Sequence, residues 1–248
     1  MSELDAKNIA LLIDADNVNP KGIDSVLTVL AELGQVNIRR AYGNWAKDAL
    51  KKWGDITNRY GIRPHQQFDL TRGKNATDMA MSIDAVDLLY QGKVDGFGIM
   101  SSDSDFTPLV TRLRQDGLPV YCFGDGKTPM ALKTACTRFI DVDKLMHGDR
   151  PAKTEAPARK GDQPAEPQIT DNAVEQELID LLGDAWKASN RDDDGYARLQ
   201  EVGQIAGNRS SFDVRNYGFK QLSEMFRSLD RFDIKRGSNG QLYVRRLR

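Results

Sequence analysis

Short apolar runs alternate with amphipathic helical patterns over the first half of this chain, and that alternation restricts the fold more than any other feature. The runs lie at 8–14, 36–42, 62–68, 96–101 and 119–123, and the helical patterns at 20–34, 46–60, 76–90 and 106–115. Strands that alternate with helices are typical of a parallel sheet covered by helices on both faces. Ligands of such sheets bind outside the carboxyl ends of the strands. We therefore expect an α/β fold with its site at that edge.

The second half of the chain has a different pattern. An apolar stripe predicts one helix, a second helix ends near Gly207, and a third spans 217–229. Two alternating segments around the turn Gly237–Gly240 then predict a β-hairpin. Three helices and a hairpin make a winged helix, a small α+β domain. The first helix rests on the stripe Val174, Leu178, Leu181, Leu182 and Trp186.

Residues 149–167 separate these two parts and contain four prolines and four alanines. A segment of this composition buries too little apolar surface to order itself, so we interpret it as a flexible linker. The expected organisation is an α/β domain at 1–148, the linker at 149–167 and a winged-helix domain at 168–248.

Composition narrows the chemistry. The 248 residues are 40% hydrophobic and 29% charged, and no apolar run is long enough to span a bilayer, so we expect a cytoplasmic protein without membrane contact. Two cysteines, Cys122 and Cys136, and two histidines, His65 and His147, argue against a disulfide framework, a zinc centre or a Ser-His-Asp mechanism. Hydrolytic chemistry would have to use carboxylates.

Acidic residues follow two of the predicted strands. Asp14 and Asp16 end the first strand in LLIDADN, and Asp103 and Asp105 end the fourth in IMSSDSDF. If these strands are neighbours, four carboxylates converge and repel one another unless protons or a cation neutralise them. Oxygen ligands favour Mg²⁺ or Mn²⁺. The alternative is that these acids only form turns. The nearby Ser101, Ser102 and Thr107 either form turns and caps or contact metal-bound water or phosphate.

Asp78 is a fifth acidic candidate. On a helical wheel it borders the arc that we expect to be buried, with Asp84 and Asp87 off that arc. The expected arc consists of Met79, Ile83, Val86, Leu89 and Tyr90. A first-turn Asp also complements the helix dipole, which is the alternative role. The preceding loop contains Arg72 and Lys74, whose charges suit a phosphate.

Three blocks of the sequence resemble the NYN domain, a ribonuclease-like branch of the PIN superfamily. They are IALLIDADNV, KNATDMAMSIDAVDLLY and GIMSSDSDFTPLVTRLRQDG, within residues 8–143. The resemblance implies a PIN-like three-layer α/β/α sandwich with a mainly parallel sheet. It also implies a Mg²⁺ or Mn²⁺ site at Asp14, Asp78, Asp103 and Asp105 with Asn17 in support. Ser102 replaces the usual glycine of the third block, and Asp16 stands where the family varies.

That resemblance implies hydrolysis of RNA phosphodiester bonds. The metal site suits this reaction, because attack on an anionic phosphodiester needs cations that neutralise charge and activate water. We expect Asp14 and Asp103 to be the primary ligands, and Asp78 and Asp105 to be further ligands or to position water. Asn17 would orient a water molecule at the metal. Arg72 and Lys74 are the expected phosphate contacts of this domain.

The run NYGFKQLSEMF at 216–226 and the hairpin after it resemble the OST-HTH or LOTUS module, a winged helix associated with RNA binding and sometimes with protein partners. Residues 209–248 hold 10 basic and 4 acidic residues, which suits a polyanion. Tyr217 and Phe219 are either core residues or base-stacking platforms. The expected contacts with single-stranded or structured RNA are Arg215, Lys220, Arg227, Lys235, Arg236, Arg245 and Arg246.

Two other functions fit parts of the sequence. DADNV also matches the DxDx[TV] motif of haloacid-dehalogenase-type phosphatases, with Asp14 as nucleophile and Asp16 as acid. However, Pro20 and an amphipathic helix follow where those enzymes usually insert a flap. The second alternative is an RNA-binding regulator that does not cleave RNA.

Overall fold

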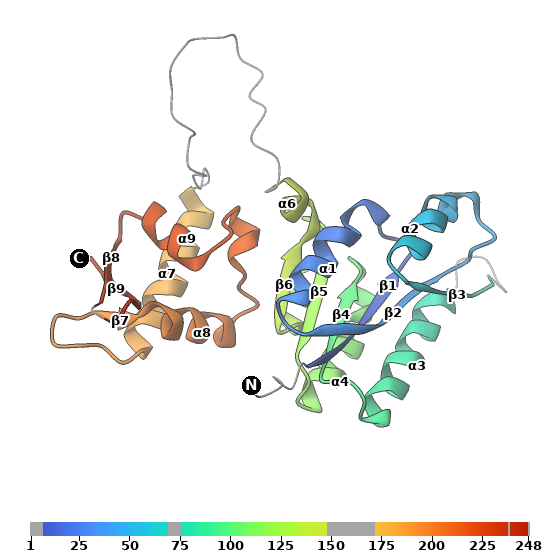
Figure 1. Cartoon of the computed structure of the whole chain (residues 1–248), viewed down its shortest axis with the longest axis horizontal. Helices are drawn as coiled ribbons and strands as arrows, with labels where there is room; N and C mark the ends of the chain where they lie inside the picture. The colour runs from blue at the N-terminus through green and yellow to red at the C-terminus, as the bar shows by residue number, and fades with distance from the viewer. Residues whose placement is uncertain (1–6, 69–75, 148–171, 238, 248) are drawn as a thin grey trace, which may run out of the picture. The chain divides into compact units, whose positions relative to one another are not determined.

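The computed structural model describes residues 7–68, 76–147, 172–237 and 239–247, and their contacts separate two units, Met1–Asp143 and Lys144–Arg248. Figure 1 shows the elements of both units. The predicted linker 149–167 and the loop with Arg72 and Lys74 lie outside the described residues. The domain boundaries at 148 and 168 therefore stay predictions.

The first unit is built on a sheet of six strands in the order β3-β2-β1-β4-β5-β6. Every neighbouring pair is parallel, as the alternating pattern predicts. β1 lies in the middle and is buried from Ile9 onward, because helices cover both of its faces. The strands are β1 (Asn8–Asp14), β2 (Gln35–Gly43), β3 (Arg63–Gln66), β4 (Gly96–Met100), β5 (Val120–Gly124) and β6 (Arg138–Asp141).

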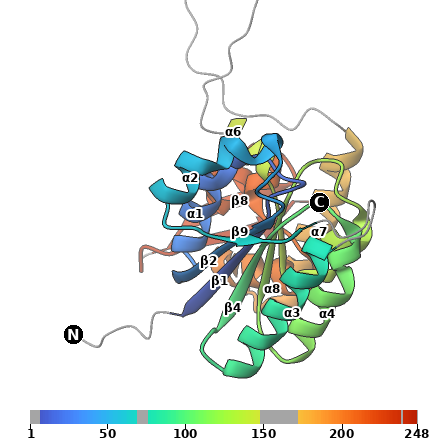
Figure 2. The same cartoon turned by 90° about the vertical axis from the view of Figure 1, so that its right-hand side faces the viewer.

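Helices pack on both faces of this sheet, which gives the three expected layers (Figure 2). On one face, α3 and α4 bury Met81, Leu88 and Val110 against Leu12 and Phe97 of the strands. On the other, α1 comes so close to β4 that a Cβ on Gly98 would lie 2.9 Å from Leu30. The helices are η1 (Pro20–Gly22), α1 (Ile23–Ala31), η2 (Asp48–Trp53), α2 (Gly54–Arg59), α3 (Ala76–Gln91), η3 (Ser104–Phe106), α4 (Thr107–Gln115), α5 (Met130–Ala135) and α6 (Val142–His147).

The sequence prediction was wrong in part after β2 and incomplete after β5. The helix expected at 46–60 is a 3₁₀ segment, η2, followed by the short helix α2. Gly54 stands at their junction, and glycine is a poor helix former. The prediction also lacked α5, β6 and α6. β6 has only four residues with charges at both ends, so it shows little alternation.

The buried face of α3 agrees with the predicted arc only in part, because Val86 and Leu89 pack against the core and the other three residues of the arc are exposed. Met79, Ile83 and Tyr90 are 63%, 55% and 71% exposed, whereas Met81 and Leu88 are buried against the sheet. The helix has two apolar sides. The side with the small Ala85 faces the sheet, because a small residue lets helix and sheet pack closely. Asp78 still borders the buried arc, from its other side.

The second unit has the predicted winged-helix elements. Its three helices bury Leu182, Val202 and Phe226 in one core beside an antiparallel sheet of order β7-β9-β8. Its elements are α7 (Asn172–Ala188), β7 (Ala197–Arg198), α8 (Leu199–Arg209), η4 (Val214–Tyr217), α9 (Leu222–Ser228), β8 (Phe232–Arg236) and β9 (Leu242–Arg246).

The third helix of this unit is shorter than predicted. It begins at Leu222 rather than Tyr217, because Gly218 adopts a left-handed conformation with φ +82° and ends the preceding 3₁₀ segment. Gln221 and Glu224 then form a capping box that starts α9. Phe219 and Tyr217 pack in or against the core, which supports the structural interpretation of both.

Across the parts of the chain that the structure describes, every helix is too short or too polar to cross a bilayer.

The orientation of α3 can be tested with two methionines of the same helix. We expect Met81→Ala to lower the free energy of unfolding by about 2–5 kcal/mol, because it leaves a cavity under the helix. Met79→Ala is the matched control and should change stability by less than about 0.5 kcal/mol, since Met79 is exposed. Urea denaturation of the full chain measures both. Equal losses would contradict this packing.

Candidate functional site

The acidic residues meet at the carboxyl edge of the parallel sheet. β1 and β4 are neighbours, as predicted, so Asp14 at the end of β1 lies beside the segment that follows β4. That segment carries Asp103 and Asp105. Asp78 is in the first turn of α3, which packs on β1 and β2. Three different elements thus bring carboxylates to one place.

Asp14 is fully buried and held by two neighbours. Asn17 donates from Nδ2 to both carboxylate oxygens, at 3.2 and 3.0 Å, and the Ser101 hydroxyl donates to Oδ2 at 2.9 Å. Burial raises the pKa of Asp14 above its ordinary value, while the hydrogen bonds from Asn17 and Ser101 oppose the rise. The nearby charges of Asp16 and Asp103 raise it further. Asn17 thus orients the carboxylate of Asp14, whereas from the sequence we expected it to orient a water molecule at the metal.

Ser101 connects the ends of β1 and β4. Its buried hydroxyl donates to Asp14 and accepts from the backbone N–H of Asp103 at 3.1 Å. Asp103 in turn accepts from the N–H of Asp105 at 2.9 Å and so caps η3. From the sequence we expected a turn or cap role for Ser101, or a contact with metal-bound water or phosphate, but not this hydrogen bond to Asp14.

Asp78 experiences the charge of the whole cluster. Burial, followed by the negative charges of Asp14, Asp103, Asp105 and Asp16, raises its pKa to about 6. A carboxylic acid that ionises only near pH 6 indicates an excess of negative charge in its surroundings. Repulsion of this kind is the electrostatic property that a cation or an added proton relieves.

Asp16 lies at the border of this cluster and connects it to other elements. Its carboxylate accepts from the backbone N–H of Asn44 at 3.3 Å and from the hydroxyl of Thr77 at 3.0 Å. Lys47 forms an ion pair with it at 3.4 Å. Asp16 thus ties the end of β1 to the loop after β2 and to the start of α3.

A network that the sequence analysis missed holds α3 against β2. Asp84, predicted to lie off the buried arc, is half-buried and accepts hydrogen bonds from Arg40 and from the hydroxyl of Tyr42. Burial, and next the hydrogen bond to Asp84, raise the pKa of Tyr42 well above its usual range. His65 packs on Tyr42 with ring centroids 5.0 Å apart. These contacts fix the helix that carries Asp78.

The donor set at this edge suits a hard divalent cation. Carboxylates from β1, α3 and the segment after β4 supply only oxygen. Thr107 follows Asp105 by two residues in the sequence. Its hydroxyl oxygen is buried and has no hydrogen-bond partner among the described residues. Within those residues, however, no three Asp, Glu, His or Cys side chains are arranged as a group that could hold a metal ion. The chemistry fits a cation, whereas the side-chain conformations do not enclose one.

The basic residues predicted to bind RNA in the second unit differ in how free their charges are. Lys235 pairs with Asp192 at 3.5 Å, and Arg245 pairs with Asp233 at 3.5 Å. Both cations also lie over the ring of Tyr196. Arg246 and Arg215 pair with Asp180 and Asp213. Arg227 and Arg236 are exposed, and Lys220 is exposed as well but has interactions of its own. Cys122 and Cys136, for which the sequence indicates no role, are buried free thiols in the core of the first unit.

Comparison with known proteins identifies both halves of the chain. The sequence model of the NYN domain matches residues 8–143, and that of the OST-HTH/LOTUS domain matches residues 172–244, in the order expected from the sequence.

Individual relatives add little about activity. An uncharacterized protein of Methanocaldococcus jannaschii is 30% identical over 121 residues, which are 47% of this chain and 47% of that protein, so the chain spans about half the length of this curated relative. A crystal structure of a protein of unknown function from Vibrio parahaemolyticus RIMD 2210633 is 21% identical, with a TM-score of 0.47. The match covers 58% of this chain and 98% of that one.

The charge at Asp78 gives a pH dependence. Its pKa of about 6 lies above the ordinary 3.8, so folding favours the protonated acid, and the stability that this group contributes falls as pH rises from about 4 to 6. We expect Asp78→Asn, which stays neutral, to gain stability relative to the parent chain over that interval. Urea denaturation of both proteins at pH 4 and pH 7 in metal-free buffer measures the change.

Carbon-13 NMR of the Asp78 carboxyl provides the direct measurement, with an expected midpoint of about 6. Added Mg²⁺ should lower that midpoint, because a nearby cation favours the ionised form. A midpoint near the ordinary 3.8 without metal would contradict the charge coupling described here.

Proposed function

The chain belongs to the NYN domain family, part of the PIN-like nuclease superfamily, and from that premise we propose that it is a metal-dependent ribonuclease that hydrolyses RNA phosphodiester bonds. The observation that carries this proposal is the convergence of Asp14, Asp78, Asp103 and Asp105 at the carboxyl edge of the sheet, where burial and then the charges of the other acids raise the pKa of Asp78 to about 6.

Asp14, Asp78, Asp103 and Asp105 are the residues that would hold Mg²⁺ or Mn²⁺. When bound, such a cation neutralises charge on the phosphodiester and lowers the pKa of water. The protein contributes the positions of the carboxylates. Asn17 and Ser101 hold Asp14 in one orientation, and Ser101 also fixes the backbone of Asp103. Asp105 and Asp78 would supply the remaining carboxylates around the cation, at which water and the phosphodiester would be aligned.

The second unit supplies affinity for RNA. It matches the OST-HTH/LOTUS domain, and its exposed Arg227 and Arg236 suit phosphate contacts. With residues 149–167 as a tether, an RNA held by this unit is present at a high effective concentration near the carboxylates. A protein partner of the winged helix and the cytoplasmic location stay predictions from the sequence.

One observation favours a second function, an RNA-binding regulator without catalysis. No carboxylate group in the described part of the chain has the arrangement to hold a metal, and such a site would be inactive until RNA or a partner reorganised it. The phosphatase alternative has less support. It needs Asp16 as an acid, and Asp16 is engaged by Asn44, Thr77 and Lys47.

Cleavage of labelled RNA by the full chain tests the primary proposal. We expect cleavage with Mg²⁺ or Mn²⁺, none with EDTA, and at least about a hundredfold loss of rate in Asp14→Asn and Asp103→Asn, because each removes a charge that aligns the reaction. Asp87→Asn is the matched control, since Asp87 is an exposed acid of α3, and should cleave normally.

RNA that is bound but never cleaved would contradict the ribonuclease proposal and favour the regulator. Release of phosphate from a small phosphoester, with loss of that activity in Asp14→Asn, would instead favour a phosphatase.

The two classes of basic residue in the second unit give a separate prediction. Arg236→Ala should lower RNA affinity and reduce the slope of log affinity against log salt by about 0.7, because it removes one phosphate contact. Lys235→Ala should cost less, because its charge is shared with Asp192 and with the ring of Tyr196. Fluorescence anisotropy of labelled RNA at several salt concentrations measures both. Equal losses would show that the ion pairs open on binding.

A further inference from the structure

Two aromatic residues follow strands that end at the same edge of the sheet as the carboxylates. Trp45 follows β2 and is half-buried, and Phe68 follows β3 with 64% of its surface exposed. The strand order β3-β2-β1 places the ends of these two strands next to the end of β1, where Asp14 lies. Neighbouring strands are about 4.8 Å apart, so β3 is only about 10 Å from β1. The two aromatic residues therefore follow strands that end at the same edge of the sheet as the proposed reaction site.

Trp45 is fixed in place by β3. Its backbone N–H donates to Oε1 of Gln66 at 3.0 Å, and its indole N–H donates to the backbone carbonyl of His65 at 2.9 Å. Gln66 also donates from Nε2 to Oδ1 of Asn44 at 3.1 Å. A ring held in this way loses little conformational freedom when a ligand stacks on it.

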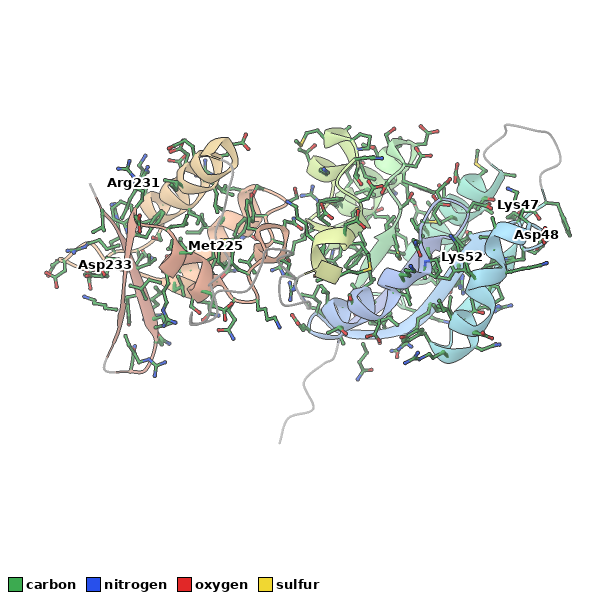
Figure 3. The ribbon with its side chains drawn as sticks, turned by 90° about the horizontal axis from the view of Figure 1, so that it is seen from above. Lys47, Asp48, Lys52, Met225, Arg231 and Asp233 are labelled. Carbon is green, nitrogen blue, oxygen red and sulfur yellow. The ribbon has the colours of Figure 1, made fainter. Side chains whose placement is uncertain are left out.

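Basic side chains follow Trp45 along the segment between β2 and α2, where Lys47, Asp48 and Lys52 lie (Figure 3). Lys47 is within 3.4 Å of Asp16 and 43% exposed, so it lies at the border of the carboxylate cluster. Lys52 is exposed on η2. Lysines at this position reduce the repulsion that an approaching phosphate chain experiences from the acids.

We propose that Trp45 and Phe68 form a base-stacking platform for single-stranded RNA, with Lys47 and Lys52 binding its phosphates, so that the strand enters the carboxylate site from the β3 edge. This inference rests on the proposed ribonuclease function and specifies its substrate. Only an unpaired strand offers free base faces to aromatic rings, whereas a duplex keeps its bases stacked inside. The platform thus selects single strands without selecting a sequence.

Tryptophan fluorescence provides a local measure of this contact. The chain has three tryptophans, of which Trp53 is fully buried, so Trp186→Phe leaves Trp45 as the accessible reporter. In EDTA, which prevents metal-dependent cleavage, we expect a short oligouridylate to quench the fluorescence of this variant of the full chain. A preformed RNA duplex should not quench it. A further Trp45→Phe change should abolish the response.

Phe68→Ala, added to the same background, tests the second ring without risk to the fold, because Phe68 is largely exposed. We expect the quenching midpoint to rise about 5- to 150-fold. Tyr90→Ala is the matched control. Tyr90 is an aromatic residue 71% exposed at the other end of α3 from Asp78, and the midpoint should not change.

The result separates this inference from the ribonuclease proposal. Metal-dependent cleavage without quenching of Trp45, or a Phe68→Ala midpoint equal to that of Tyr90→Ala, would overturn the platform and leave the ribonuclease intact. Equal quenching by duplex RNA would also overturn it. Single-strand quenching that Phe68→Ala weakens, in a chain that never cleaves RNA, would support the platform while the ribonuclease proposal fails.

Discussion

The buried carboxylate of Asp14 is the point on which the first unit depends. It ends the central strand, it is fully buried, and it is satisfied by Ser101 from the segment after β4 and by Asn17 from its own turn. A buried carboxyl group without such partners would be costly. The same Ser101 hydroxyl accepts a hydrogen bond from the backbone N–H of Asp103, so a residue that makes burial of Asp14 tolerable also positions a neighbouring acid.

Among the residues that the structure describes, negative charge accumulates around that point. Burial, and then the charges of four other acids, raise the pKa of Asp78, and its helix is held to the sheet by the pairing of Asp84 with Arg40 and Tyr42. Basic residues instead lie at the border, where Lys47 meets Asp16. The fold thus keeps repelling groups together with packing and hydrogen bonds, which is typical of a site that binds a charged ligand.

The parallel sheet, the neighbouring strands β1 and β4, and the winged helix agree with the expectation from sequence. Burial of one face of a helix or strand leaves a periodic pattern of apolar residues that is visible in the sequence. The buried face of α3 was predicted wrongly in part, since Met79 and Ile83 are as apolar as Met81 and Leu88 and only tertiary packing distinguishes them. The hydrogen bonds of Ser101, Asp84 and Trp45 were not predicted, for a related reason. Their roles arise from contacts with residues 20 to 87 positions away, which no local pattern records.

The short edge strand β3 has a consequence for association between molecules. An open sheet edge can pair with a strand of another chain and start aggregation. β3 is only four residues long, and its sequence RPHQ includes a proline, which lacks a donor, and an exposed arginine. Such an edge is a poor template for a further strand, so the sheet stays finite there. Strand pairing with another copy of the protein at β3 would therefore not compete with the RNA platform proposed at Trp45 and Phe68.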